Sequence, residues 1–76
     1  MIRILIADDH PIVRKGLREI LTETKDMFDV SEAENGPEVL NRLDKEDYDV
    51  LVLDISMPGL SGLDVLKQVK KRKSTI

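Results

Sequence analysis

Three aspartates directly follow apolar stretches of the chain, where their carboxylates could share a cation. Asp8 and Asp9 come after Ile2–Ala7, and Asp54 comes after Val50–Leu53. Two like charges about 4 Å apart cost about 4 kcal/mol at an effective dielectric constant of about 20, so a converging set needs a cation. Oxygen ligands with room for water suit Mg²⁺ or Mn²⁺, whereas no cysteine and one histidine exclude most structural zinc sites. We therefore predict an exchangeable Mg²⁺ or Mn²⁺ site.

A carboxylate beside such a cation can act as a nucleophile toward phosphorus. A metal ion that bridges carboxylate and phosphate neutralises charge, so one aspartate could accept a phosphoryl group as an acyl phosphate. Each aspartate alone is explained as well by a helix cap or a strand end. The joint site is favoured because two separate apolar stretches end in acids at positions that an α/β fold brings together.

Two kinds of element must position these acids. The nearly continuous apolar runs Ile2–Ala7 and Val50–Leu53 predict buried parallel strands, and the weaker alternation of Phe28–Ala33 predicts an edge strand. A helix begins at Pro11 after a cap at Asp9 or His10. A second helix begins at the turn Asn35-Gly36-Pro37 and ends at Glu46 and Asp47. A third helix begins near Leu63. The expected inward residues are Val13, Leu17, Ile20, Leu21, Val39, Leu40, Leu43, Leu66 and Val69.

The alternation of strands and helices predicts right-handed crossovers, a parallel sheet and a ligand site beyond the carboxyl ends of the strands. With 76 residues, 41% hydrophobic and 36% charged, the chain fits one ordered domain. No apolar run of membrane length and no leader pattern is present, which predicts a cytoplasmic location without membrane binding. Neither a P-loop nor a GxGxxG fingerprint supports nucleotide binding.

The charge distribution argues against nucleic-acid binding by this chain. The net charge is -3, but five of the 12 basic residues lie in 67–73 and all 15 acids precede them, so residues 1–66 carry -8. An acidic body favours a cation or a basic partner. The basic residues without interleaved aromatics are typical of a solvated last helical turn.

The motifs Asp8-Asp9, at the end of one apolar strand, and Leu53-Asp54-Ile55-Ser56-Met57-Pro58-Gly59, at the end of another, resemble those of response-regulator receiver domains. The likeness runs from Met1 to the end of the chain, and the Asp-Asp-His-Pro run is most similar to the subfamily with LuxR-type DNA-binding output domains. It implies a flavodoxin-like α/β fold. Residues 1–76 would form its amino-terminal part, three parallel strands ordered 2-1-3 with three helices.

The resemblance also implies roles for the site residues. Asp54 would be the phosphoacceptor, and Asp9 and Asp54 would bind Mg²⁺ (or Mn²⁺) directly. Ser56 would contribute its backbone carbonyl, and Asp8 would act through water. In Met57-Pro58-Gly59, proline would fix φ and glycine would permit the turn. We set His10 aside as a helix cap or surface residue rather than a catalytic base.

A sensor histidine kinase is the partner that the resemblance implies. Its phosphotransfer helices would dock on the first helix, with Pro11, Val13, Arg14 and Leu17 as candidate contacts, although Val13 and Leu17 could equally be core. A complete receiver has a five-stranded sheet, whose later units carry a hydroxyl residue and a lysine that assist phosphorylation. Neither has a match in this chain, so we expect impaired phosphotransfer. We also expect a free apolar edge at Val50–Leu53 that promotes self-association.

Three functions therefore stand side by side. The leading one is a signalling module, not an enzyme, that accepts a phosphoryl group on Asp54. The first alternative is a receiver fragment that binds partners or itself without phosphotransfer. The second is an Mg²⁺-dependent phosphohydrolase, which would need a further acid and a substrate lid that 76 residues do not supply.

Overall fold

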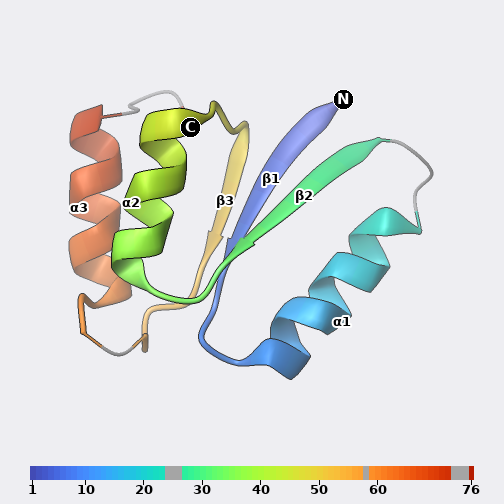
Figure 1. The fold of residues 1–76 in the computed structure, drawn as a ribbon, viewed down its shortest axis with the longest axis horizontal. Coiled ribbons are helices and arrows are strands. Elements are labelled where there is room, and N and C mark those ends of the chain that lie inside the picture. The colour runs from blue at the N-terminus through green and yellow to red at the C-terminus, as the bar shows by residue number, and fades with distance from the viewer. Residues whose placement is uncertain (24–26, 58, 73–75) are drawn as a thin grey trace.

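The computed structural model describes residues 1–23, 27–57, 59–72 and 76. Its elements have the predicted order (Figure 1). All three strands have the predicted bounds, and the third helix begins one residue before its prediction. The predicted roles of Pro58 and Lys73 lie outside the described residues. The elements are β1 (Ile2–Ala7), α1 (Pro11–Thr22), β2 (Phe28–Ala33), α2 (Gly36–Lys45), β3 (Val50–Leu53) and α3 (Gly62–Arg72).

The strands form one parallel sheet in the order β2-β1-β3, which confirms the predicted 2-1-3 arrangement of a flavodoxin-like fold. Their register places Ala7 of β1 opposite both Ala33 of β2 and Leu53 of β3. The carboxyl ends of the three strands are therefore level. Residues that follow β1 and β3 begin at the same edge of the sheet.

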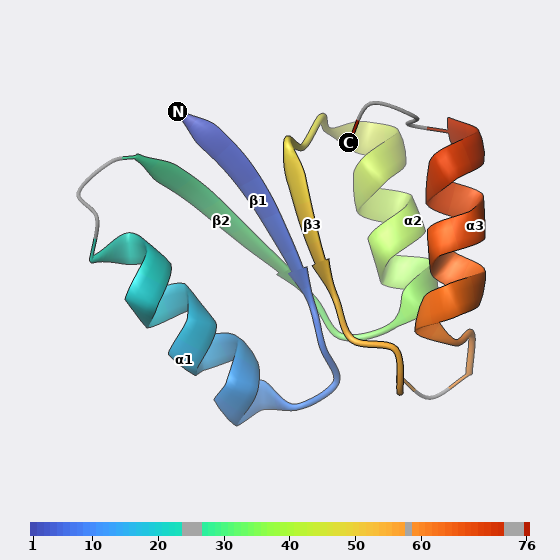
Figure 2. The same ribbon diagram turned by 180° about the vertical axis from the view of Figure 1, so that it is seen from behind.

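Helices cover the two faces of the sheet unequally, with α1 on one face and the pair α2 and α3 on the other (Figures 1 and 2). Along β1, Leu5 and Ala7 pack toward α2 and α3, whereas Ile4 and Ile6 pack toward α1. These four side chains are at most 5% exposed. Burial on both faces explains the apolar run from Ile4 to Ala7, because none of these four positions faces water.

β3 is less buried than its apolar sequence predicts. Leu51 and Leu53 pack against the core under α2 and α3, but Val50 and Val52 are 42% and 40% exposed. This face is uncovered because α1 packs over β1 and β2 instead of over β3. The expected free edge is present, since β3 pairs only with β1 in the described part of the chain.

Only part of the predicted apolar face of α1 is buried. Leu17 and Leu21, four residues apart, pack against Ile4, Ile6 and Val30 of the sheet. Ile20 is 65% exposed, so its expected inward position is wrong. Val13 is 45% exposed, so of its two readings the surface contact fits better than the core. A stripe at i and i+4 is enough for one helix over two strands, and residues beside it turn toward solvent.

The buried stripe of α3 agrees with its prediction at Val69 but not at Leu66. Val65 and Val69 are fully buried, whereas Leu66, which was expected to point inward, is 40% exposed. Val65 and Val69 are again four residues apart and face the core shared with α2. The sequence offered two overlapping apolar stripes here, and packing selected one of them.

The start and end of α2 agree with the sequence. The side chain of Asn35 caps the helix by accepting a hydrogen bond from the backbone N–H of Glu38 at 2.9 Å, and Pro37 lies in the first turn. Glu46 is the residue that ends the helix. In the described ranges, no helix combines the length and the apolar character that crossing a bilayer requires.

Candidate functional site

The acids lie at the carboxyl edge of the sheet, where strand register fixes their backbone. Asp8 and Asp54 follow the paired residues Ala7 and Leu53. The N–H of Asp54 donates to the carbonyl of Ala7 at 2.9 Å, and the N–H of Asp8 donates to the carbonyl of Ala33 at 3.1 Å. The hydrogen-bond ladder thus extends one residue beyond the strands, and it holds both aspartates side by side.

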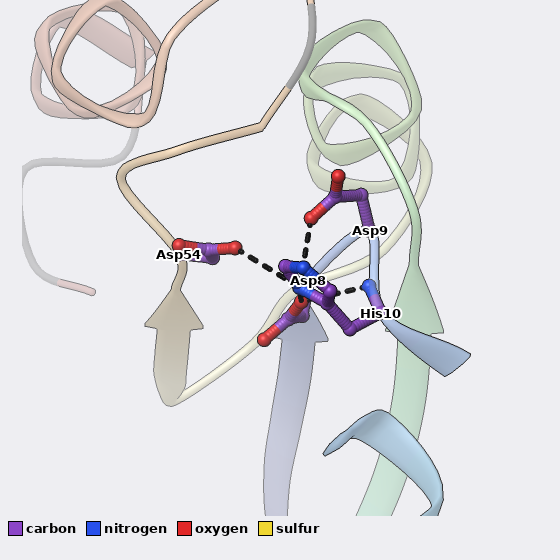
Figure 3. Close-up of side chains that lie close together, drawn as sticks. All are labelled: Asp8, Asp9, His10 and Asp54. Atoms are coloured by element: carbon purple, nitrogen blue, oxygen red, sulfur yellow. Dashed lines mark hydrogen bonds and ion pairs between the residues drawn. The ribbon is translucent and has the colours of Figure 1, made fainter. Parts of the chain in front are cut away.

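The carboxylates of Asp8, Asp9 and Asp54 converge as predicted, and the imidazole of His10 lies among them (Figure 3). One potential ligand atom from each of these residues lies within 4.8 Å of the others. The three carboxylate side chains are 14%, 27% and 22% exposed. This geometry allows the cluster to enclose a cation from the protein side while leaving one side open to water and an incoming group.

His10 is the residue whose role the sequence analysis missed. It is the N-cap residue of α1, as predicted, but its side chain caps nothing. Its ring nitrogen Nδ1 lies 2.7 Å from Oδ1 of Asp8, 3.0 Å from Oδ1 of Asp9 and 3.7 Å from Oδ2 of Asp54. The available signal was its position directly after Asp8-Asp9, since a histidine beside two converging acids can join their cluster.

The acids and His10 shift each other's protonation. The pKa of His10 is raised above its ordinary 6.5, first by the hydrogen bond to Asp8 and then by the negative charges of Asp9, Asp8 and Asp54. Partial burial of Asp8 raises its pKa, but hydrogen bonds from the backbone and ring of His10 outweigh that effect and leave it below 3.8. When the ring is protonated, it offsets part of the negative charge of the three carboxylates.

We expect the single histidine to titrate above pH 6.5 in metal-free buffer, as followed by the NMR shifts of its ring protons. A raised folded-state pKa means that the stability gained from protonated His10 is fully present below pH 6.5 and disappears as pH rises through the folded-state pKa. Asp8→Asn should lower this pKa, because it removes the largest cause, while Asp44→Asn should not. A titration at or below 6.5 in the unmodified chain would contradict the described cluster.

Arg14 ties the start of α1 to the same edge of the sheet. Its guanidinium donates to the carbonyl oxygen of Asp8 and lies 3.3 Å from the carboxylate of Glu32 in β2. Arg18 reaches the other oxygen of Glu32 at 2.8 Å. These bonds leave the carboxylate of Asp8 free for the cluster, since the arginine binds the backbone. Arg14 therefore positions Asp8 without neutralising it directly.

The donor set fits a hard divalent cation. Oδ1 of Asp9 is buried and accepts no hydrogen bond within the described residues, although Nδ1 of His10 lies 3.0 Å away, so its lone pairs remain available to a cation. A buried carboxylate oxygen that accepts no hydrogen bond is costly unless a cation or water binds it. Three carboxylates with access to water match the coordination that Mg²⁺ prefers. Asp8, Asp9 and Asp54 are the residues that would hold the ion.

The loop after Asp54 supports this aspartate but leaves one predicted ligand open. The N–H of Ser56 donates to Oδ1 of Asp54 at 3.0 Å, which orients the carboxylate. The predicted role of the Ser56 carbonyl as a metal ligand stays a prediction. Gly59 adopts a φ of 78°, which confirms the turn that its sequence predicted, and Met57 is buried in the core at 5% exposure.

Residues 4–76 match the family described as the response regulator receiver domain. Over 76 residues the chain is 41% identical to the transcriptional regulatory protein YdfI of Bacillus subtilis, covering 99% of this chain and 35% of YdfI. The Escherichia coli nitrate/nitrite response regulator NarL is 35% identical over 69 residues, covering 91% of this chain and 32% of NarL. The chain thus spans about a third of these curated relatives.

Solved structures agree with this assignment. The response regulator TrrA of Thermotoga maritima in complex with Mg²⁺-BeF is 43% identical, with a TM-score of 0.90, covering 97% of this chain and 63% of TrrA. TrrA in complex with the histidine kinase ThkA gives a TM-score of 0.89 at 43% identity, covering 97% of this chain and 62% of that one. The family match, the likeness to these solved structures, the converging acids and the strand order agree. The chain therefore belongs to the response regulator receiver domain family.

Proposed function

We propose that this chain is a phosphoacceptor module of two-component signalling in which Asp54 receives a phosphoryl group from a histidine kinase in an Mg²⁺-dependent reaction. One observation carries the proposal: carboxylates from two strand ends converge on one site in which Oδ1 of Asp9 is buried without a hydrogen-bond partner. Further support comes from the related TrrA, whose structure was solved with Mg²⁺-BeF.

The chemistry is an in-line displacement at phosphorus. A carboxylate oxygen of Asp54 forms a bond to phosphorus while the bond from phosphorus to the donor breaks, and the donor keeps that electron pair. Mg²⁺, when bound, supplies positive charge to the carboxylates and the phosphoryl oxygens. The chain positions the nucleophile: Ser56 holds Oδ1 of Asp54 through its N–H, and the ladder bond to Ala7 holds its backbone.

The exposed side of α1 is the proposed docking surface for the kinase. Of the four candidate contacts, Pro11 and Val13 are exposed. Leu17 packs against the sheet, and Arg14 is bound to Asp8 and Glu32, so neither is a free contact. The kinase complex of the related TrrA supports this class of partner.

This proposal makes the chain a signalling module and not a turnover enzyme. The hydroxyl residue and lysine that the family resemblance implies have no match in the 76 residues, so we expect slow phosphorylation. The relatives named as transcriptional and nitrate/nitrite regulators support a DNA-binding output of the LuxR type, the subfamily that the sequence resembles, for a protein that contains this receiver. A cytoplasmic location remains a prediction.

The proposal is tested by incubating the chain with Mg²⁺ and acetyl phosphate. We expect a mass gain of one phosphoryl group that EDTA prevents, because without a cation the three carboxylates repel the incoming phosphate. Intact-mass spectrometry measures the gain, and hydroxylamine should remove it, as it does for acyl phosphates. An equal gain in EDTA would contradict a metal-dependent site.

A second proposed property is self-association through β3. In the described residues this strand pairs on one side only, and Val50 and Val52 expose apolar side chains beside the free edge. Two identical edges can pair antiparallel about a twofold axis, so that each copy satisfies the other's backbone groups. Association would also cover apolar surface that is costly to leave in water.

We expect the chain to elute as a dimer or larger species in light scattering at micromolar concentration, and Val52→Lys to shift it toward monomer. A lysine on an edge strand opposes pairing because its charge must stay hydrated. Ile12→Lys is the matched control, since Ile12 is 86% exposed on α1, away from the edge. A folded, monodisperse monomer of the unmodified chain would reject self-association.

A further inference from the structure

One nitrogen atom faces all three carboxylates of the proposed metal site. Nδ1 of His10 is 2.7 Å from Oδ1 of Asp8, 3.0 Å from Oδ1 of Asp9 and 3.7 Å from Oδ2 of Asp54. A ring nitrogen of His10 also belongs to the set of potential ligand atoms that lie within 4.8 Å of one another. The protein thus offers three oxygen donors and one nitrogen donor at a single point.

The local backbone holds the ring in this direction. The N–H of His10 donates to Oδ1 of Asp8 at 2.8 Å, and the ring nitrogen contacts the same oxygen. His10 has extended backbone angles, φ -100° and ψ 105°, immediately before the proline that starts α1. A residue before proline prefers this extended conformation, so the sequence itself favours the inward placement. The ring is presented to the acids by backbone geometry as well as by charge.

Nitrogen and oxygen donors select different metal ions. Mg²⁺ prefers oxygen ligands and keeps several waters, whereas imidazole binds Co²⁺, Ni²⁺ and Zn²⁺ well, with affinities that rise along the first transition row to Cu²⁺. We infer that His10 is an additional ligand of this site, whose Nδ1 lone pair raises the affinity for Co²⁺ and Ni²⁺ relative to Mg²⁺. This inference rests on the proposed metal site and adds a selectivity that three carboxylates alone would not provide.

If His10 were only a positive charge beside the carboxylates and not a metal ligand, its removal would change the metal affinities in a different way. If His10 acted only as a positive charge that substitutes for a metal ion, its removal would strengthen the binding of every divalent cation to a similar extent, because all carry the same charge. If His10 is a ligand, its removal weakens Co²⁺ and Ni²⁺ and leaves Mg²⁺ unchanged or slightly stronger. The ratio of affinities therefore separates the two roles.

The test is calorimetric titration of the 76-residue chain and its His10→Gln variant with Mg²⁺, Mn²⁺, Co²⁺ and Ni²⁺, each used alone. We expect the variant to lose about tenfold or more in Ni²⁺ and Co²⁺ affinity, the scale on which metal-site substitutions act, without a loss for Mg²⁺. The His10 side chain is 61% exposed, so the variant should fold. Ile12→Gln, at an 86% exposed neighbouring position, should leave all four affinities unchanged.

A spectroscopic readout is independent of affinity. Because the chain has one histidine, paramagnetic shifts of its ring protons on Co²⁺ binding report ligation by His10 directly. Shifted ring signals together with the altered ratio support the inference. Uniformly tighter binding in His10→Gln, or an unchanged ratio with Mg²⁺ still bound, overturns it and leaves the proposed function standing. If the unmodified chain binds none of the four ions, both this inference and the proposed function fail.

Discussion

Replacing Asp54 with asparagine is expected to abolish the magnesium-dependent mass gain from acetyl phosphate. The amide has nearly the same shape but is too weak a nucleophile to form the acyl phosphate. Its oxygen can still accept the hydrogen bond from Ser56, and the backbone bond to Ala7 is unaffected. One of three neighbouring negative charges also disappears, so we expect no loss of folding stability. Intact-mass spectrometry and circular dichroism on the same sample check both statements.

A matched substitution separates the loss of the nucleophile from a general loss of charge. Asp44→Asn makes the same chemical change at an exposed position on α2, where Asp44 pairs with Arg72 at 2.9 Å. It should keep the full mass gain. His10 is the competing nucleophile in the cluster, and it would give a phosphoramidate, which survives the alkali that hydrolyses an acyl phosphate. A gain that persists in Asp54→Asn would refute the assignment of Asp54 and direct attention to this histidine.

The positions of the acids could be predicted from sequence because they depend on strand ends. Continuous apolar runs define where β1 and β3 stop, and parallel strands of one sheet stop at the same edge. The convergence of Asp8 and Asp54 thus follows from two local patterns and one topological rule. The order of the strands could not be predicted in this way, because the apolar runs do not show which strands are neighbours in the sheet. The family resemblance supplied that order, and the structure confirms it.

Side-chain exposure could not be predicted as well, because it depends on which element lies opposite. Val52 and Leu53 are equally apolar, yet Leu53 packs under α2 and α3 while Val52 is 40% exposed. In α3, Val65 and Leu66 lie four and three residues before Val69, so both have helical spacing and the sequence pattern did not show which of them points inward. Tertiary packing made these choices. The orientation of His10 was missed for a related reason, since the expected capping role gave no reason to place its ring among acids.

Replacing Gly62 with alanine is expected to destabilise the fold by about 3 kcal/mol, the upper end of the usual cost of overpacking. A Cβ at this position would lie 2.5 Å from the Cα of Ile55 and even closer to the carbonyl oxygen of Asp54. Both are backbone atoms and cannot rotate away as a side chain would. A chain of this size has about 4 to 11 kcal/mol of stability in total, so the loss is a large fraction.

Gly16→Ala is the matched control, because it makes the same change in the interior of a helix where nothing lies within 4 Å of the new Cβ. Alanine should stabilise α1 there by about 1 kcal/mol, since glycine has a greater entropy cost in a helix. Urea or thermal unfolding followed by circular dichroism measures both variants. The two glycine substitutions should therefore shift the transition in opposite directions.

Gly62 also links folding to the proposed site. Its N–H donates to the carbonyl of Ile55 at 3.0 Å, so the first residue of α3 is bound to the backbone that directly follows Asp54. An alanine can be accommodated only if this backbone moves, which would shift the carboxylate of Asp54 relative to Asp9. We therefore expect Gly62→Ala to weaken Mg²⁺ binding even where the variant remains folded, whereas Gly16→Ala should not. If Gly62→Ala changed neither the free energy of unfolding nor the Mg²⁺ affinity, Gly62 would not pack as closely on the backbone of Asp54 and Ile55 as the structure places it.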